Sequence, residues 1–342
     1  MNATIAELDG KRLISYVKQQ RGARDDGVRL EARALRGGLV SPSVLHVNAR
    51  FLDAQGQPRS TSFVVKSLAA GTEREAAIYE GLLGSVGGLA PALFAIDRSE
   101  RTTLLYLEPI ISRRRWPWRD LSLAARVLQK LSELHTAPVA AELPDWDYDA
   151  ELAVSAAQTL DRAERYAARS GDRPARAALP SLRRLAGDIG AARRELVSGA
   201  VLPATIVHGD VHPGNVLVRT RGSEDEPLLL DWGRARYGSP LEDVSSWIQW
   251  LGFWEPAARR KHDTLLGVYL RARGMAAPPA RAVRSAYWLS AAINACSGAL
   301  AYQLAVAAEA RVGRARAATA LRAAHDCFRV IRRADLARRG AG

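Results

Sequence analysis

Two short segments of the sequence carry side chains of the types that phosphoryl transfer requires. Asp210 and Asn215 stand five residues apart in a His-Gly-Asp-Val-His-Pro-Gly-Asn run that begins at His208, and Asp231 follows three leucines. A carboxylate can orient a hydroxyl nucleophile, and an amide and a second carboxylate can hold magnesium. The order of these residue types therefore predicts a phosphotransfer site.

The stretch between Asn215 and Asp231 is predicted to form a β-hairpin. Apolar runs at 216–218 and 228–230 flank the polar segment 219–227. Two apolar runs around a glycine-containing polar loop are typical of paired strands. Such a hairpin would bring two metal ligands that are distant in sequence side by side. A buried hairpin with polar residues capping its ends is the alternative explanation.

These segments resemble the signature of the aminoglycoside phosphotransferase family, whose kinship includes choline kinases and the eukaryotic protein kinases. The run that begins at His208 is similar to the H-R-D-x-x-x-x-N loop of protein kinases, and Asp-Trp-Gly at 231–233 is similar to their D-F-G. Gly233 departs from the Asp-Trp-Glu that is more usual in this family, but the aspartate is intact. The resemblance implies an α+β, bilobal protein-kinase-like fold, with a small antiparallel-sheet N-lobe containing one helix and a larger, mainly helical C-lobe.

The resemblance also implies cofactors and roles for individual residues. ATP or GTP and Mg²⁺ are the expected cofactors, Asp210 is the expected catalytic residue, and Asn215 and Asp231 are the expected metal ligands. Asp243 matches a family aspartate that supports the catalytic loop by hydrogen bonding. The two histidines that flank Asp210, at 208 and 212, are expected to brace the loop rather than to move protons.

A kinase of this kind also needs a strand lysine paired with a glutamate on the next helix. The chain has five lysines, and one of them, Lys66, lies in the β-branched run 62–68, which is typical of a strand. Glu75 follows in the segment 73–83, whose apolar spacing is helical. An amine in an apolar strand is costly to bury without an anionic partner. We therefore expect a Lys66–Glu75 pair in which Lys66 reaches the nucleotide phosphates; a water-facing lysine on an edge strand is the alternative.

Two further segments complete the expected nucleotide site. A glycine pair precedes an alternating strand, and backbone amides in that turn could face phosphates, although a plain turn is the alternative. The resemblance places the hinge between the lobes after the strand that begins at Thr102, where backbone groups read the adenine. The residues assigned to nucleotide contact are Gly37, Gly38, Ser41, Ser43, Glu108 and Ile110.

The acceptor is expected to be a small hydroxyl compound. From Leu131 to Leu160 there is no lysine or arginine, while six acidic residues occur. These acids could bind an amine-bearing acceptor, or they could complement a helix N-terminus. The tryptophans of segment 247–254 could stack on a sugar ring or a cation, although their helical spacing also suits core packing. The residues assigned to acceptor contact are Asp145, Asp147, Asp149, Trp247 and Glu255.

Length and composition set the remaining expectations. The 342 residues suffice for two lobes, predicted at 1–109 for nucleotide binding and 110–342 for catalysis and acceptor binding. Two cysteines are too few for a disulfide framework, and the N-terminal residues lack the apolar core of a signal peptide, so a cytoplasmic location is expected. Residues 285–308 carry no charge, but their alanines and polar residues favour a buried helix over a membrane span.

A net charge of +13 permits nucleic-acid binding, but the basic residues are dispersed, so no nucleic-acid partner is expected. We therefore predict an ATP- or GTP-dependent kinase that transfers the γ-phosphoryl group to a small-molecule hydroxyl. Aminoglycosides and other amine-bearing compounds are candidate acceptors, and antibiotic resistance is a candidate role. The contrasting hypothesis is a non-catalytic kinase-like protein that binds nucleotide or scaffolds a partner. Such proteins usually lack the lysine or one of the two aspartates, and all three are present here.

Overall fold

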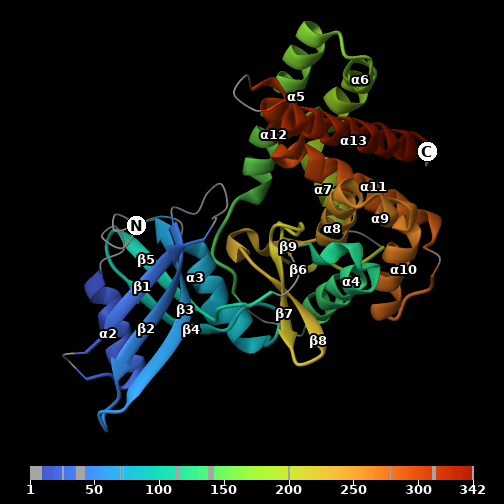
Figure 1. The fold of residues 1–342 in the computed structure, drawn as a ribbon. Coiled ribbons are helices and arrows are strands. Elements are labelled where there is room, and N and C mark those ends of the chain that lie inside the picture. The colour runs from blue at the N-terminus through green and yellow to red at the C-terminus, as the bar shows by residue number, and fades with distance from the viewer. Residues whose placement is uncertain are drawn as a thin grey trace.

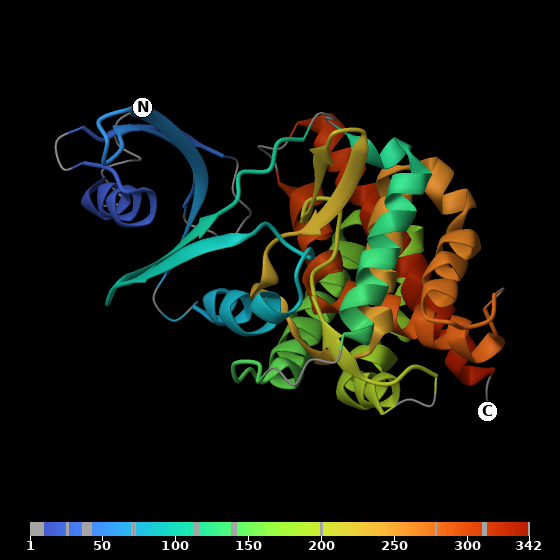
Figure 2. The same cartoon turned by 90° about the horizontal axis from the view of Figure 1, so that it is seen from below.

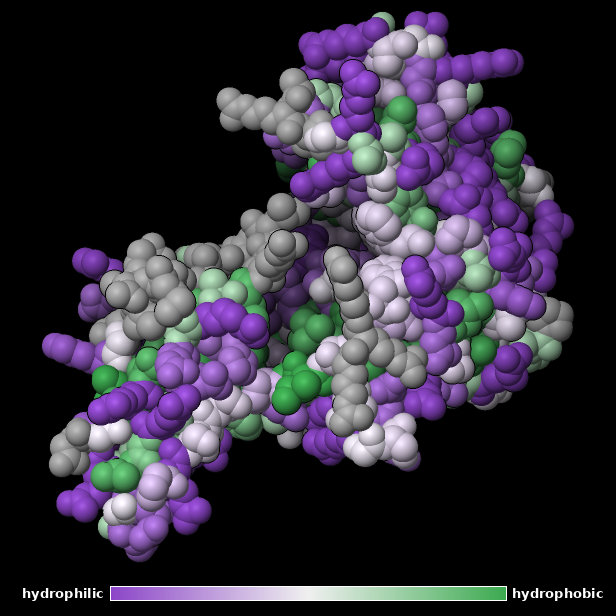
Figure 3. All heavy atoms as spheres, in the orientation of Figure 1, coloured by the Kyte–Doolittle hydropathy of each residue, from purple (hydrophilic) through white to green (hydrophobic). Residues whose placement is uncertain are grey.

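The structure is a computed structural model that describes residues 10–24, 27–35, 43–69, 71, 73–112, 116–137, 142–198, 201–277, 279–309 and 313–340. A sheet-based N-lobe, blue to cyan in Figure 1, stands beside a helical C-lobe coloured green to red. Figure 3 shows that this face of the molecule is hollowed between the two lobes. The predicted bilobal α+β arrangement is therefore confirmed.

The N-lobe is built on a five-stranded antiparallel sheet of order β1-β2-β3-β5-β4. Its strands are β1 (Arg29–Ala34), β2 (Ser43–Leu52), β3 (Pro58–Ala69), β4 (Leu93–Arg98) and β5 (Thr102–Leu107). Strand β3 lies at the centre of the sheet, and side chains along it alternate between the two faces. Every second residue of β3 therefore points to the same face of the sheet.

One face of the sheet is covered by α2 (Gly10–Arg21), and the other by α3 (Arg74–Ile78) and its continuation, the π-helical turn η1 (Tyr79–Leu83). Phe63 and Val65 of β3 pack with Tyr16 of α2 in a separate N-lobe core, where the Tyr16 and Tyr106 rings stack at 4.0 Å. Lys66 has the opposite orientation and faces α3. Helix α2 is an addition to the single N-lobe helix that the resemblance implied.

The C-lobe is mainly helical. Its helices are α4 (Leu121–Thr136), α5 (Tyr148–Ser170), α6 (Arg173–Gly187), α7 (Ile189–Val197), α8 (Pro240–Trp254), α9 (Pro256–Arg260), α10 (His262–Ala272), α11 (Arg281–Asn294), α12 (Leu300–Ala308) and α13 (Arg314–Arg339), with the short turns η2 (Pro117–Arg119), η3 (Trp232–Arg234) and η4 (Ala295–Ala299). The large hydrophobic core runs through these helices and includes α3 and η1. The α3 side of the N-lobe is therefore anchored to the C-lobe.

Two short antiparallel ribbons lie within the C-lobe. Strand β6 (Thr205–Val207) pairs with β9 (Arg236–Gly238), and β7 (Val216–Arg221) pairs with β8 (Glu224–Leu229). Figures 1 and 2 place the yellow β7–β8 hairpin on the side of the C-lobe that faces the N-lobe sheet. The Leu229 N–H donates to the Leu89 carbonyl at 2.8 Å, which ties the hairpin to the segment that precedes β4.

Residues Arg281–Ala308 form the one described segment that is long and apolar enough to cross a membrane. It consists of α11, the π-helical turn η4 and α12, with a kink at Gly298, where φ is 123°. Half of its most apolar stretch of residues is buried inside the protein, where α11 packs against α8 and α13. This placement is that of a core helix, as its alanines and polar residues predicted.

Candidate active site

The predicted hairpin is present and joins the two segments that carry the expected metal ligands. Val216 stands opposite Leu229 in the β7–β8 pair. Just beyond the strands, the Leu230 N–H donates to the Asn215 carbonyl at 2.8 Å. Asn215 therefore lies beside the residue that precedes Asp231, as the sequence predicted.

The hairpin is tighter than predicted, because the polar segment 219–227 is mostly paired strand rather than loop. Only Gly222 and Ser223 remain in the turn. Cross-strand pairs stabilise the polar strand ends: the Arg219 guanidinium contacts the Glu226 carboxylate at 2.5 Å. Charge complementarity between facing residues thus extends the strands beyond their apolar cores.

Asp210 is held in place by the loop that contains it. The Asn215 side-chain amide donates to the Asp210 carbonyl and to its Oδ2, both at 3.0 Å. The Asp210 N–H donates to His208 Nδ1 at 3.2 Å. The carboxylate itself remains 40% exposed and lines a cavity of the C-lobe, so it is positioned but still accessible to a hydroxyl group.

His208 is a fully buried support of this loop. Its Nδ1 accepts from Asp210, so the proton is on Nε2, which donates to the Leu230 carbonyl at 2.9 Å. Burial lowers the pKa of His208 and favours this neutral form. The histidine therefore links the catalytic loop to the end of the hairpin, in agreement with the predicted bracing role. His212 also supports the loop backbone, because its Nδ1 accepts from the Gly214 N–H at 3.0 Å.

Asp243, in the first turn of α8, accepts hydrogen bonds from the backbone of the same loop. The His208 and Gly209 N–H groups donate to its two carboxylate oxygens at 2.7 and 2.8 Å, and His135 Nε2 lies 3.1 Å away. Burial acts to raise the pKa of Asp243, but the hydrogen bond and proximity of His135 hold that pKa below its usual value. A buried carboxylate thus fixes the loop backbone, as the resemblance implied.

Asp231 adopts a backbone conformation that a residue other than glycine rarely takes. Its φ of 65° and ψ of 62° make it the one non-glycine residue of the described chain with positive φ. Such conformations cost free energy and persist where surrounding structure imposes them. Here Trp232 is buried, and its Nε1 donates to the Leu229 carbonyl at 3.0 Å. Next to this anchored indole, the Asp231 side chain reaches Lys66 of the N-lobe.

Lys66 meets two carboxylates. Its Nζ lies 2.5 Å from Glu75 Oε2, so the predicted pair is present, and 2.9 Å from Asp231 Oδ1. Burial acts to lower the pKa of Lys66, but the two carboxylates outweigh it and raise that pKa, so the amine stays charged. One buried cation therefore connects β3, α3 and the segment after β8.

The oxygen donors at this point are of the kinds that a magnesium ion shared with phosphates takes. No group of three or more His, Cys, Asp or Glu side chains within the described ranges could hold a metal alone. Magnesium characteristically takes one or two protein oxygens and completes its shell with phosphate oxygens and water. The Asp231 carboxylate and the amide oxygen of Asn215, whose nitrogen is engaged by Asp210, form such a partial set. The donor set fits the expected cofactor.

The other residues assigned to nucleotide contact are less informative. Gly37, Gly38 and Ser41 lie outside the described residues, and Ser43 begins β2 opposite Ser67. The Glu108 N–H donates to the Ala92 carbonyl at 2.8 Å, and its carboxylate pairs with Arg219 at 2.9 Å. The Glu108 side chain thus ties the predicted hinge to β7, and its backbone N–H is engaged within the N-lobe rather than free for a nucleotide. Ile110 lies in the connection that follows and is half-buried.

A cavity of about 740 Å³ opens beside Asp210. Catalytic-loop residues, the C-terminal half of α8, the kinked α11–α12 segment and α13 form its walls. Its aromatic residues are Trp116, Trp250, Phe253, Trp254 and Tyr302. A space of this size next to the expected catalytic carboxylate is the candidate acceptor site.

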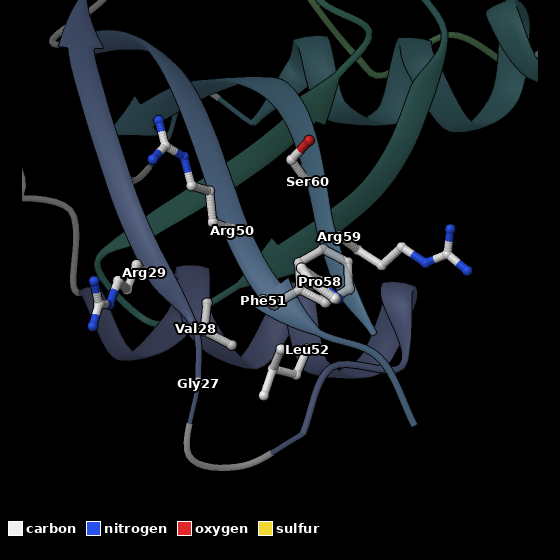
Figure 4. Close-up of a pocket in the computed structure, with 9 residues that line it drawn as sticks. All are labelled: Gly27, Val28, Arg29, Arg50, Phe51, Leu52, Pro58, Arg59 and Ser60. Atoms are coloured by element: carbon white, nitrogen blue, oxygen red, sulfur yellow. The ribbon is translucent and has the colours of Figure 1, made fainter. Parts of the chain in front are cut away.

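A separate cavity of about 650 Å³ lies in the N-lobe, at the ends of β1, β2 and β3. Figure 4 shows its three arginines, Arg29, Arg50 and Arg59, pointing away from one another. Arg59 is paired with Asp53 at 2.8 Å. None of the predicted catalytic or metal residues lines this cavity, and its cations do not converge on a common point, so it is not the phosphotransfer site.

Two of the residues assigned to acceptor contact have other roles. Trp247 has no exposed surface: its Nε1 donates to the Ala124 carbonyl at 3.1 Å, and its ring packs edge-on against Trp118. The assignment of Trp247 to acceptor contact is therefore corrected to core packing. Glu255 caps α9 by accepting from the Ala257 N–H and does not line the cavity. Trp250 and Trp254 of the same helix line the cavity in its place, although neither was assigned to acceptor contact.

The acids of the predicted acceptor segment have different partners, and two of them, Asp149 and Glu151, are paired with arginines. Asp147 caps α5 by accepting from the Ala150 N–H at 2.9 Å. This is the helix N-terminal role that the sequence offered as the alternative to amine binding. Asp149 pairs with Arg193 at 2.6 Å. Asp145 is exposed, and neither it nor the other two lines the cavity. The structure thus does not bring the three aspartates to the acceptor side of Asp210.

The chain matches a known protein family over most of its length. The model of the phosphotransferase enzyme family, which is also abbreviated APH, matches residues 50–287. The chain belongs to this family. A search of curated proteins by sequence finds no match. The predicted family is therefore confirmed, and membership supports a small-molecule phosphotransferase.

Solved structures of such enzymes superimpose on most of the chain. Choline kinase from Cryptosporidium parvum Iowa II gives a TM-score of 0.58 at 11% identity, covering 97% of this chain and 99% of that chain. Amicoumacin kinase hAmiN, in a complex with AMP-PNP, Ca²⁺ and Ami, gives 0.56 at 12% identity, covering 96% of each. The GDP complex of aminoglycoside 2′-phosphotransferase-IIIa gives 0.53 at 15% identity, covering 94% and 99%. These likenesses confirm the predicted kinase-like fold.

Proposed function

We propose that this protein is a kinase that transfers the γ-phosphoryl group of ATP or GTP to a hydroxyl group of a small molecule. The observation that carries the proposal is the convergence on Lys66 of Glu75 and Asp231, at 2.5 and 2.9 Å. This arrangement connects the N-lobe sheet to the loop that holds Asp210. A lysine–glutamate pair beside a metal-binding aspartate is the set that phosphoryl transfer uses to fix a nucleotide.

Each residue has a separate task in this proposal. Lys66, held by Glu75, contacts the nucleotide phosphates, while Asn215 and Asp231 hold Mg²⁺, which neutralises charge on those phosphates. Asp210 orients the acceptor hydroxyl and accepts its proton; its carboxylate is fixed by Asn215 and open to the acceptor cavity. Phosphoryl transfer depends mainly on positioning and electrostatics, which this rigid loop supplies.

The comparisons support the cofactor proposal at a coarser level. One neighbour was solved with AMP-PNP and Ca²⁺, and another with GDP, so similar folds hold purine nucleotides and a divalent cation. The alternative, a non-catalytic nucleotide-binding or scaffold protein, would not need to keep the lysine and both aspartates. All three residues are present and mutually arranged, which favours catalysis.

An Asp210→Ala variant tests the proposal. Turnover of nucleotide with a panel of hydroxyl compounds should fall by about 10²- to 10⁴-fold, because the group that accepts the proton is lost. Affinity for the Mg²⁺ complex of ATP or GTP, measured by calorimetry, should be unchanged. A Glu224→Ala variant, which removes an exposed acid from the β7–β8 hairpin, is the matched control. Wild-type protein that binds nucleotide but phosphorylates no compound in the panel would favour the non-catalytic alternative.

A further inference from the structure

The acceptor cavity is walled by aromatic side chains that reach its mouth. Trp116, Trp254 and Tyr302 are among the large hydrophobic residues that stay exposed, at 36%, 48% and 39%. Deeper in the wall, the ring of Phe253 packs edge-on against Trp254 at 4.7 Å and against Trp250 at 6.4 Å. These side chains come from three separate parts of the C-lobe and meet at one opening. Exposed aromatic surface of this kind marks a binding site for a partly apolar ligand.

The charges around the cavity are already neutralised. Asp326, on α13, contacts Arg259 and lies 3.3 Å from Arg329, and Arg234 is paired with Glu151 at 2.8 Å. Among the described residues that line the cavity, Asp210 is therefore the one carboxylate without an arginine or lysine partner. A ligand in this space would find a single unpaired acid, and that acid is the proposed catalytic group.

The remaining polar groups of the wall are uncharged and serve to hold the helices together. The Asn294 amide donates to the Glu242 carbonyl and to Ser245 Oγ at 2.8 and 3.0 Å, which connects α11 to α8. Ser297 Oγ donates to the Asn294 carbonyl at 2.9 Å. Gly298, at the kink, leaves open space where a side chain would stand. The wall thus offers hydroxyl, amide and aromatic surface, and its second acid, Asp326, is already paired with arginines.

We propose that the acceptor is an uncharged hydroxyl compound with an apolar ring, rather than an amine-rich polycation. The inference rests on the proposed function, since it names the acceptor for the same catalytic aspartate. Each ammonium group of a polycation that leaves water needs an anionic partner or an aromatic face, and the cavity has no carboxylate to spare for several of them. A chain with a net charge of +13 also repels cations at long range. An apolar ring, in contrast, gains from contact with Trp250 and Trp254.

Three matched probes and a polycation test the proposal. Methyl β-glucoside, phenyl β-glucoside and phenyl 2-amino-2-deoxy-β-glucoside share a sugar ring and differ by an apolar ring or one ammonium; kanamycin is the polycation. Their affinities are measured by saturation-transfer NMR with AMP-PNP and Mg²⁺ present. Phenyl glucoside should bind about tenfold more tightly than methyl glucoside, since burial of one ring is worth a factor of that order. The amino compound should bind more weakly than phenyl glucoside, and kanamycin more weakly still.

Two variants test whether the preference for phenyl glucoside over methyl glucoside comes from the aromatic wall of the cavity. Trp254→Ala should reduce the preference for phenyl over methyl glucoside to less than about threefold, because it removes an aromatic ring at the mouth. Tyr237→Ala, an exposed aromatic on β9 that does not line the cavity, should leave the preference intact. A stronger affinity for the amino compound or kanamycin overturns the inference, as does no detectable binding of phenyl glucoside at millimolar concentration. AMP-PNP affinity is measured in the same samples, so a failure of nucleotide binding identifies a failure of the proposed kinase function instead.

Discussion

On the proposed nucleotide side of the site, charged side chains meet in pairs and are partly buried, whereas on the proposed acceptor side aromatic and amide groups form the walls. Lys66 holds Glu75 and Asp231 within 2.9 Å, and Asp231 stands in a conformation that its neighbours impose. The acceptor cavity instead has its charges cancelled by ion pairs at the rim, such as Arg234 with Glu151. Phosphates and a metal require fixed opposite charges, while a variable acceptor requires only shape and a single carboxylate.

The two sides also differ in how the chain builds them. Hydrogen bonds between residues that are near one another in the sequence hold together the proposed catalytic loop, from His208 to Asn215. Asp243 of α8 fixes the backbone of this loop. The cavity depends on packing among α8, the α11–α12 kink and α13, which are far apart in the chain. Substitutions in the loop should therefore act on chemistry, and substitutions in the cavity on acceptor choice.

The largest effect that would sharpen this contrast is expected for Lys66→Met. Turnover should fall by about 10²- to 10³-fold, because a preorganised cation aimed at the phosphates is lost. Steady-state kinetics with a saturating acceptor give the measurement. Lys130→Met is a matched control. Lys130 also contacts two carboxylates, those of Glu133 and Glu226, but it lies on α4 and does not contact Asp231.

The Lys130→Met control should keep turnover within about twofold of wild type, because Lys130 pairs with Glu133 and Glu226 and with none of the proposed catalytic or metal-binding residues. Equal losses of turnover in Lys66→Met and Lys130→Met would contradict a special role of Lys66. They would mean that removal of any paired lysine lowers turnover through lost stability alone. Near-normal turnover of Lys66→Met would remove Lys66 from the proposed site.

A smaller effect concerns pH and the buried loop histidine. Burial holds the pKa of His208 below its usual value of 6.5, so the unfolded chain binds more protons than the folded one in mildly acidic solution. The contribution of His208 to stability is therefore complete above about pH 6.5 and is lost as pH falls toward the folded pKa. Its slope is at most about 1.4 kcal/mol per pH unit.

Urea unfolding at several pH values, with the variant His208→Gln, measures this term. The variant should show a shallower loss of stability below pH 6.5, because glutamine can donate to the Leu230 carbonyl but does not titrate. His325→Gln, which removes a histidine paired with Asp172 at 2.8 Å, should keep the His208 slope. An unchanged slope in His208→Gln would show that the loop histidine is not held neutral.

Sequence reasoning worked where a local pattern demands a partner. An amine in an apolar strand needs an acid, so Lys66 predicted Glu75, and two apolar runs around a polar turn predicted that Asn215 and Asp231 come together. The fold followed from the same residues through their resemblance to a known family. Strand ends were less accurate, because the cross-strand pair of Arg219 with Glu226 extends the hairpin into a segment that reads as loop.

The acceptor side could not be predicted in the same way. Helical spacing shows that Trp247, Trp250 and Trp254 share a face of α8, but it does not show that this face turns from the core to a cavity along the helix. Trp247 is covered by Trp118, whereas Trp254 stays exposed. Similarly, Asp149 and Glu151 look free in sequence, because their partners, Arg193 and Arg234, come from distant elements.

A titration of ATP into wild type and Asp231→Ala, each with Mg²⁺ and with EDTA, tests the nucleotide side most directly. In wild type, Mg²⁺ should strengthen binding by about 10- to 100-fold, since a charge-assisted contact to the metal is gained. Asp231→Ala should lose this gain, while Asp161→Ala, which removes an exposed acid from α5, should keep it. Nucleotide affinity that is indifferent to Mg²⁺ in wild type, or a gain that survives in Asp231→Ala, would contradict the assignment of Asp231 as the metal-binding residue of a kinase.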